Sequence, residues 1–175
     1  MDAFDCVMTK LDVRDYSTKK VPGDIRMKIL EAGRMTGSGM NRQHWKFILV
    51  QERGNLKTLS QDSTTGRWIE GADFAIIILT NPEYGFHLID AGRAAQNMQV
   101  AAWNYGVVSC VFTGVKNESL RRDFKIPEAV YPSIILGFGY PARKLTGRRK
   151  DRKPLREITA LENWEQTLDP KAVGV

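Results

Sequence analysis

The most constraining feature of this 175-residue chain is its longest apolar run, Phe74-Ala-Ile-Ile-Ile-Leu79. The run has the length of a buried strand and is far too short to span a membrane. A strand buried on both faces needs an apolar cover on each side of its sheet. The run therefore predicts a central sheet that is covered by helices.

Strand and helix patterns alternate along the rest of the chain. Strands are expected over 45–51, 74–80, 107–113 and 131–137, and the first two have the pattern of buried strands. Helices are expected over 3–9, from Pro22 onward, over 55–61, over 86–105 and over 117–124. The 86–105 helix is the longest, with an apolar face of Ile89, Ala95, Met98, Ala102 and Tyr105. This mixture indicates an α+β or α/β domain, and the length suits one domain over 1–175.

The net charge of the chain lies in one segment. Residues 142–153 hold seven of the 26 Lys and Arg and one acid, so the other residues sum to zero. Such a segment is expected to meet a nucleic acid, an acidic surface or a single phosphate. No aromatic residue is interleaved among these cations, and we therefore disfavour nucleic-acid binding.

Cysteine and histidine are scarce, with only Cys6, Cys110, His44 and His87 in the chain. A zinc cluster of the usual Cys/His kind cannot be assembled from them. Two scattered thiols suit a reducing compartment, and the charged N-terminus does not read as a signal peptide, so we expect a cytoplasmic protein. Cys110 lies in an apolar stretch and is expected to be a buried, inert thiol.

The C-terminal arm, residues 154–175, regains apolar side chains after the basic segment. Ile158, Leu161 and Trp164 need a surface to pack on. A second copy of the chain is the simplest supplier of that surface, so we expect a homodimer.

Three polar clusters stand out as candidate binding residues. The first is Lys10, Asp12 and Arg14, the second is the loop 38–43, and the third is Lys150-Asp-Arg152. Each has an ordinary alternative, as a solvated linker, a turn or a charge run. Together they offer cations to a phosphate and amides to a planar ring, which suits a mononucleotide-type cofactor. The usual phosphate-loop, dinucleotide and serine-hydrolase motifs are absent from the sequence.

Several short motifs, in order, resemble the nitroreductase-like family of FMN-dependent oxidoreductases. They are 10–16 (KLDVRDY), 37–45 (GSGMNRQHW), 90–97 (DAGRAAQN), 137–141 (GFGYP) and 152–155 (RKPL). The resemblance implies an α+β fold with a central, mostly antiparallel sheet flanked by helices. It also implies a homodimer, completed by the C-terminal arm, with FMN at the interface.

The resemblance further implies which residues bind FMN. Lys10, Lys150 and Arg152 would hold the phosphate, with Leu11 and Asp12 beside it, and Arg14 would approach the N1/C2 side of the flavin. Ser38, Met40 and Asn41 would come from the opposite subunit, and Thr113, Gly114 and Arg67 would complete the ring site. NAD(P)H would deliver a hydride to flavin N5, and a small acceptor such as a nitroaromatic or quinone would take the electrons. No catalytic side chain is needed, because the flavin carries the chemistry.

Some positions depart from the family pattern. Asp12 stands where the family has a Ser, Leu11 where it has Arg or His, and Gly37 and His44 where it has prolines. Either the basic segment compensates for Asp12, or Asp12 turns away and pairs with an Arg, or FMN binds weakly. A ferredoxin-linked or flavin-consuming member of the family is the alternative enzyme, and a basic nucleic-acid-binding module is the alternative outside enzymes.

Overall fold

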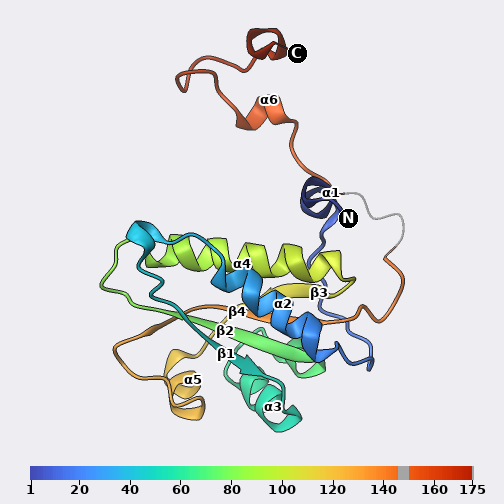
Figure 1. The fold of residues 1–175 in the computed structure, drawn as a ribbon, viewed down its shortest axis with the longest axis vertical. Helices are drawn as coiled ribbons and strands as arrows, with labels where there is room; N and C mark the ends of the chain where they lie inside the picture. Colours follow the sequence, from blue (N-terminus) through green and yellow to red (C-terminus); the bar gives the residue numbers. More distant parts are fainter. Residues whose placement is uncertain (146–149, 175) are drawn as a thin grey trace.

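A computed structural model of the chain describes residues 1–145 and 150–174 (Figure 1). The helices are α1 (Ala3–Thr9), α2 (Gly23–Arg34), α3 (Arg53–Gln61), α4 (His87–Asn104), α5 (Asn117–Asp123) and α6 (Leu155–Ile158). The strands are β1 (Lys46–Val50), β2 (Phe74–Thr80), β3 (Val108–Phe112) and β4 (Tyr131–Gly139). Three short 3₁₀ turns complete the order, η1 (Gly39–Asn41), η2 (Arg67–Gly71) and η3 (Pro170–Val173).

The four strands form one sheet in the order β1-β2-β4-β3, and every neighbouring pair is antiparallel. β2, the strand predicted from the longest apolar run, is buried at all of its positions and pairs on both sides. The predicted α+β organisation with a central antiparallel sheet is therefore confirmed.

Side chains of β2 alternate between two apolar layers, as the pleat of a strand requires. Phe74, Ile76 and Ile78 pack with residues of α2 and α4 on one face of the sheet. Ala75, Ile77 and Leu79 pack with residues of α3, α5 and η2 on the other face. Figure 1 shows the result, with α2 and α4 above the sheet and α3 and α5 below it.

Two expectations about burial are wrong in the single chain. The strand predicted over 45–51 is the edge strand β1, and only Val50 of its five residues is buried. Ile89 and Tyr105, assigned to the apolar face of α4, are 65% and 37% exposed. An apolar pattern in the sequence does not distinguish a side chain that packs in the core from one that lies on the surface or in a contact between molecules.

Two element ends also differ from expectation. α5 ends at Asp123 rather than at Phe124, the end expected from the sequence, and Phe124 takes the C-cap position. β4 continues through Gly137 to Gly139, although a strand end was expected at Gly137.

The two glycines create room on β4, because a Cβ at Gly137 would meet the Trp68 ring at 2.8 Å and one at Gly139 would meet the Tyr16 ring at 2.8 Å.

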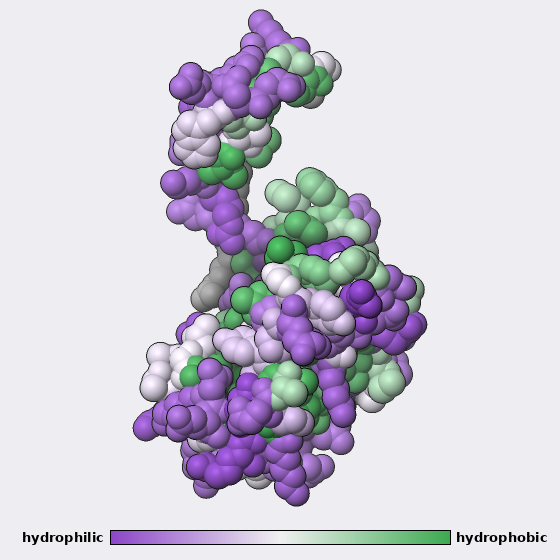
Figure 2. Space-filling view, turned by 90° about the vertical axis from the view of Figure 1, so that its left-hand side faces the viewer, coloured by the Kyte–Doolittle hydropathy of each residue, from purple (hydrophilic) through white to green (hydrophobic). Residues whose placement is uncertain are grey.

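The C-terminal arm leaves the body after the basic segment, of which 146–149 lie outside the described residues. α6 and η3 stand clear of the sheet, beyond α1 (Figure 1). Leu155 and Ile158 are each 66% exposed and Trp164 is 95% exposed. Figure 2 shows apolar surface along the arm and again on the top of the body below it.

Within residues 1–145 and 150–174, no helix combines the length and apolar character that crossing a lipid bilayer requires.

A buried carboxylate ties the segment before α2 to the start of β2. Asp73, whose side chain is 2% exposed, accepts hydrogen bonds from the Val21 N–H at 2.9 Å and from Arg26 at 2.9 Å. Lys20 Nζ lies 3.0 Å from its second oxygen as an ion-pair contact without hydrogen-bond alignment. Because water does not reach this carboxylate, the Val21 N–H and the Arg26 guanidinium have no replacement acceptor if it is removed.

We expect Asp73→Ala to lower the free energy of unfolding by about 3–5 kcal/mol, because it leaves a buried N–H and a half-buried guanidinium without their acceptor. The matched control is Asp24→Ala, which breaks an exposed pair with Lys28 and should cost roughly 0.2–1 kcal/mol. Urea unfolding of both variants measures the difference. Equal losses would contradict the role assigned to Asp73.

Candidate functional site

Cations from the two ends of the chain meet at the end of α1. The C-terminal end of a helix carries unpaired carbonyls, which attract cations. Lys150 Nζ donates to the Val7 carbonyl of α1 at 2.5 Å, and Lys10 directly follows the helix. Partial burial, and then the charges of Arg152 and Lys10, lower the pKa of Lys150 from its ordinary value of 10.5. The charges of Lys10 and Arg152 thus act on Lys150, which makes an electrostatic group of the three predicted phosphate ligands. Leu11, next to Lys10 in the chain, is half-buried.

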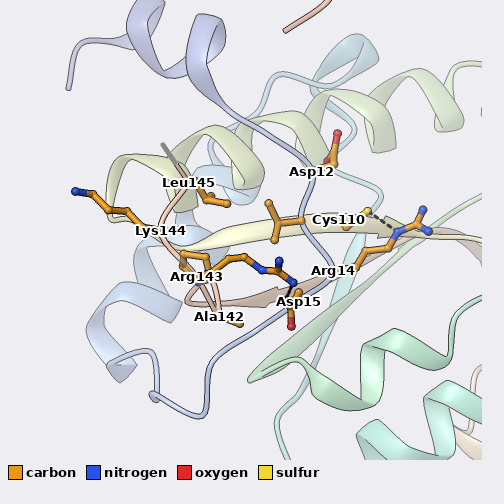
Figure 3. Close-up of a pocket in the computed structure, with 10 residues that line it drawn as sticks. Asp12, Arg14, Asp15, Cys110, Ala142, Arg143, Lys144 and Leu145 are labelled. Carbon is orange, nitrogen blue, oxygen red and sulfur yellow. Dashed lines mark hydrogen bonds and ion pairs between the residues drawn. The ribbon is translucent and has the colours of Figure 1, made fainter. Parts of the chain in front are cut away.

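Asp12, the residue that departs from the family pattern, is drawn into two contacts. Its Oδ1 lies 2.8 Å from Lys10 Nζ and accepts from Gln99 Nε2 at 3.2 Å. Gln99 is 4% exposed on α4 and also donates to Ser109 Oγ at 3.1 Å. Asp12 therefore pairs with a Lys rather than with an Arg, and its carboxylate points away from Arg14 (Figure 3).

Arg14 is held against the sheet by sulfur and by an aromatic ring. Its Nε donates to Cys110 Sγ at 3.3 Å, and its guanidinium lies 5.5 Å from the centre of the Trp68 ring. The hydrogen bond to Cys110 raises the pKa of Arg14, so Arg14 keeps its charge. Cys110 is buried, as predicted, but it has this structural partner.

The segment that carries these residues crosses the ends of β3 and β4. Asp12 bridges to Ser109 on β3, and Tyr16 bridges to Pro141 after β4. The Tyr16 hydroxyl donates to the Gly137 carbonyl at 3.1 Å, and burial raises the pKa of Tyr16, so the phenol stays protonated. The glycines of β4 allow both Tyr16 and Trp68 to lie close to the sheet.

An open cavity of about 530 Å³ lies beside Arg14. Residues 12–15, Cys110 and 141–145 line it (Figure 3). Arg143 pairs with Asp15 at 3.1 Å along its rim, whereas the Lys144 side chain extends away from it. Its size falls within the range of small-molecule and cofactor sites, which is roughly 300–1,000 Å³.

The turn after β3 places Thr113 and Gly114 at the end of that strand. The Thr113 carbonyl accepts from Ser63 Oγ at 2.5 Å and from Thr65 Oγ1 at 3.0 Å. Gly114 has φ of 70°, a conformation that favours glycine. Within the described ranges its N–H meets no hydrogen-bond acceptor. Arg67 is exposed at the start of η2, next to Trp68.

Ser38, Met40 and Asn41 form a second group that is separate from the first. Their loop meets α4 at Asp90, whereas Asp12 meets α4 at Gln99. These positions are about 13 Å apart along the helix axis at ~1.5 Å of rise per residue. One protomer therefore does not bring all the predicted site residues together.

Sequence reasoning missed Gln99 and Trp68. Gln99 carried a usable signal, because a polar residue on the otherwise apolar face of a predicted helix must find a buried partner. Trp68 carried none, since its contact with Arg14 depends on the open space above Gly137.

Comparisons with known proteins agree with this fold. A model of the nitroreductase family matches residues 8–71 and 55–140. A Methanothermobacter thermautotrophicus protein, named a candidate NADH dehydrogenase/NAD(P)H nitroreductase, is 32% identical over 151 residues, which cover 81% of this chain and 78% of that protein.

Two solved structures share the fold. A Bacteroides thetaiotaomicron protein with the same name superposes with a TM-score of 0.85 at 24% identity, covering 93% of this chain and 98% of that one. A candidate nitroreductase of Desulfovibrio desulfuricans, solved in complex with FMN, has a TM-score of 0.82 at 22% identity, covering 94% and 98%. Together with the family match, these likenesses confirm the predicted fold class, and the chain belongs to the nitroreductase family.

Proposed function

We propose that this protein is an FMN-dependent oxidoreductase that takes electrons from NAD(P)H and passes them to a small acceptor such as a nitroaromatic or a quinone. The observation that carries the proposal is a group of cations joined to a cavity: the charges of Lys10 and Arg152 act on Lys150. Lys10 pairs with Asp12, which lines the cavity beside Arg14. When bound, FMN supplies the redox chemistry, accepting a hydride and releasing electrons. The FMN complex of the Desulfovibrio protein and the name of the Methanothermobacter relative support this choice.

The charges of the site fit the phosphate of FMN. Partial burial lowers the pKa of Lys150 most, and the charges of Arg152 and Lys10 lower it further. A bound anion would relieve the part that comes from this repulsion. Lys10 is partly neutralised by Asp12, so Lys150 and Arg152 supply most of the free positive charge. In this assignment the basic segment compensates for Asp12.

The other end of the site fits the flavin ring. Arg14 keeps its charge and would stabilise negative charge on the pyrimidine side of the ring. The Gly114 N–H is a donor without an acceptor in the described part of the chain, which suits a hydrogen bond to the central ring. Thr113 and Arg67 would lie beside it. No side chain is assigned a role as acid, base or nucleophile.

We propose a homodimer because the two groups of site residues contact α4 at different points of one protomer, at Asp90 and at Gln99. Ser38, Met40 and Asn41 would reach the ring from the partner subunit. The exposed apolar side chains Phe4, Met8, Ile89, Ile158 and Trp164 would be covered in the same contact, with 154–175 as the exchanged arm. One domain over 1–175 and a cytoplasmic location remain part of this proposal.

The first test is an absorbance spectrum of the purified protein after incubation with FMN and desalting. We expect a retained flavin band that bleaches under anaerobic conditions when NADH or NADPH is added. A retained band that does not bleach would support FMN as the cofactor but contradict NAD(P)H as the electron donor, and would favour a ferredoxin or another donor. Absence of any retained flavin would contradict the proposal.

The second test concerns the phosphate contact. We expect Lys150→Gln to weaken FMN binding by about 1.5–3 kcal/mol, because a charge-assisted contact to phosphate is lost. Lys57→Gln is the matched control, since it removes the same charge from the exposed side of α3. Fluorescence titration of FMN measures both affinities. Equal affinities in the two variants would show that the phosphate is held elsewhere.

The third test is the pH dependence of the same affinity. A bound phosphate favours charged Lys150, so binding must raise its pKa above the lowered value of the free protein. As pH rises through that lowered value, FMN binding has to take up a proton and the affinity falls. We expect this loss to begin below the ordinary lysine pKa of 10.5, and to move to higher pH in Lys150→Arg. An unchanged profile in Lys150→Arg would contradict the assignment.

A further inference from the structure

The loop from Ser38 to Gln43 has a strained backbone. Met40, Asn41 and Gln43 have φ values of 50°, 53° and 46°, although none of them is glycine. Each such residue costs roughly 1 kcal/mol or more and persists only when its surroundings impose it. Local contacts support this shape: the Gln43 N–H donates to Ser38 Oγ at 2.9 Å, and the Asn41 N–H donates to the Ser38 carbonyl at 3.0 Å. Contacts within the loop do not fix where it lies on the rest of the protein.

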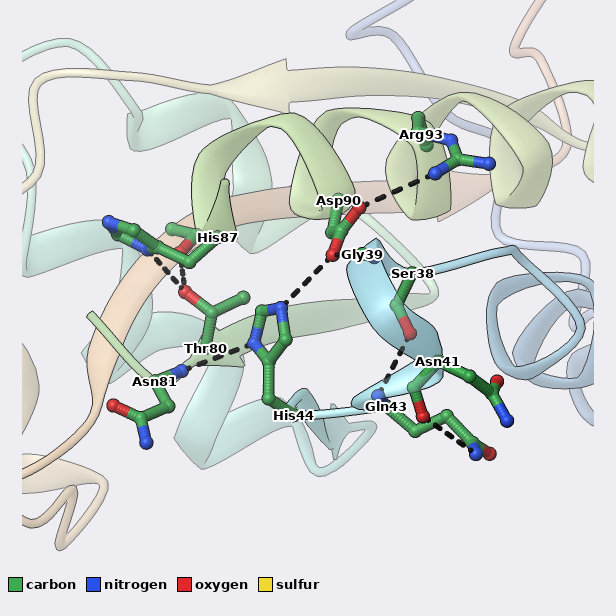
Figure 4. Close-up of polar contacts among 11 residues, drawn as sticks. Ser38, Gly39, Asn41, Gln43, His44, Thr80, Asn81, His87, Asp90 and Arg93 are labelled. Carbon is green, nitrogen blue, oxygen red and sulfur yellow. Dashed lines mark hydrogen bonds and ion pairs between the residues drawn. The ribbon is translucent and has the colours of Figure 1, made fainter. Parts of the chain in front are cut away.

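The position of the loop is set by Asp90 in the first turn of α4. Asp90 Oδ2 accepts from the Gly39 N–H at 2.9 Å and contacts His44 Nε2 at 3.1 Å. The side chains of Asp90 and His44 are only 2% and 3% exposed. Figure 4 shows this carboxylate between the loop, His44 and Arg93, whose NH1 lies 3.4 Å from Oδ1.

Close packing on the same face of α4 supports these hydrogen bonds. A Cβ at Gly39 would meet the Phe86 ring at 2.6 Å, and a Cβ at Gly37 would meet the Arg93 guanidinium at 2.8 Å. Phe86, Asp90 and Arg93 follow the i, i+4, i+7 spacing that places residues on one side of a helix. The start of α4 therefore contacts the loop, or Gly37 just before it, through three residues on one side of the helix: Phe86, Asp90 and Arg93.

His44 is enclosed and serves as a support. Its Nδ1 faces the Asn81 N–H at 3.4 Å, and its ring lies between 5 and 6 Å from the rings of Tyr84 (5.2 Å) and Phe86 (5.8 Å). With both nitrogens engaged and the side chain buried, the ring has no access to a substrate. Its contact with Asp90 fixes the end of the loop that runs into β1.

We propose that Asp90, supported by His44, is a positioning residue that holds the 38–43 loop in the shape in which Ser38, Met40 and Asn41 meet the flavin ring of the partner subunit. This inference rests on the proposed function. A binding constellation must be held to about 0.5 Å by residues that are themselves fixed, and a displacement of about 1 Å can cost a hundredfold in rate. Two buried side chains that impose a strained loop supply that kind of support.

The test compares Asp90→Asn with Asp24→Asn, an exposed helical carboxylate that loses the same charge. In the absence of FMN, we expect Asp90→Asn to increase both trypsin cleavage after Arg42 and amide hydrogen exchange at Gly39 by about tenfold. With FMN bound, we expect an altered flavin circular dichroism signal and about tenfold slower reduction by saturating NAD(P)H. Asp24→Asn should match the wild type in all four measurements.

An unchanged loop in Asp90→Asn would overturn the inference. A loosened loop with an unchanged flavin signal and reduction rate would also overturn it, because Asp90 would then have only a structural role. If Asp90→Asn does not fold, Arg93→Gln provides the same comparison from a side chain that is 53% exposed. A wild-type protein that retains no FMN contradicts the proposed function itself, and the loop measurements without FMN would then identify Asp90 as purely structural.

Discussion

The packing of α4 against the sheet is the contact on which the rest of the structure depends. α4 buries Ala91, Ala94, Ala95, Met98 and Ala102 against the face formed by Phe74, Ile76 and Ile78. Small alanine side chains allow the helix to approach the strands closely. Its two buried polar residues then have fixed positions. Asp90 meets the loop at one end of the helix, and Gln99 meets Asp12 and β3 near the other.

Much of the fold could be predicted from the sequence because its strands are strongly apolar. β2 and α1 have the predicted bounds, and the other predicted helices and strands differ by a few residues at their ends, whereas α6 was not predicted. The errors concern exposure. The sequence predicts a buried strand at β1, but β1 is an edge strand. The sequence also places Ile89 on the apolar face of its helix, but the Ile89 side chain is exposed. An apolar side chain can be shielded from water by the core of its own chain or by a second subunit, and the sequence pattern is the same in both cases.

The candidate site was predictable in its charges and less so in its contacts. The concentration of cations over 142–153 identified Lys150, and the motif around Lys10 identified its neighbour across the fold. The contacts of Arg14 with Cys110 and of Asp12 with Gln99 join residues more than 80 positions apart. Nothing local in a sequence encodes such a pair, because it exists only after α4 and β3 have packed together.

In the proposed site, the charge balance would allow a carboxylate to stand beside a phosphate. Lys10, Lys150 and Arg152 contribute three positive charges and Asp12 removes one, which leaves two. A phosphate monoester carries about −1.5 to −2 charges at neutral pH, close to that remainder. Asp12 also orients Lys10 and accepts one of the two hydrogen bonds that the buried Gln99 amide donates. In this proposal, replacing a hydroxyl ligand by the carboxylate of Asp12 would exchange one hydrogen-bond donor for a fixed cation, Lys10. Lys150 and Arg152 of the basic segment would compensate for the added negative charge.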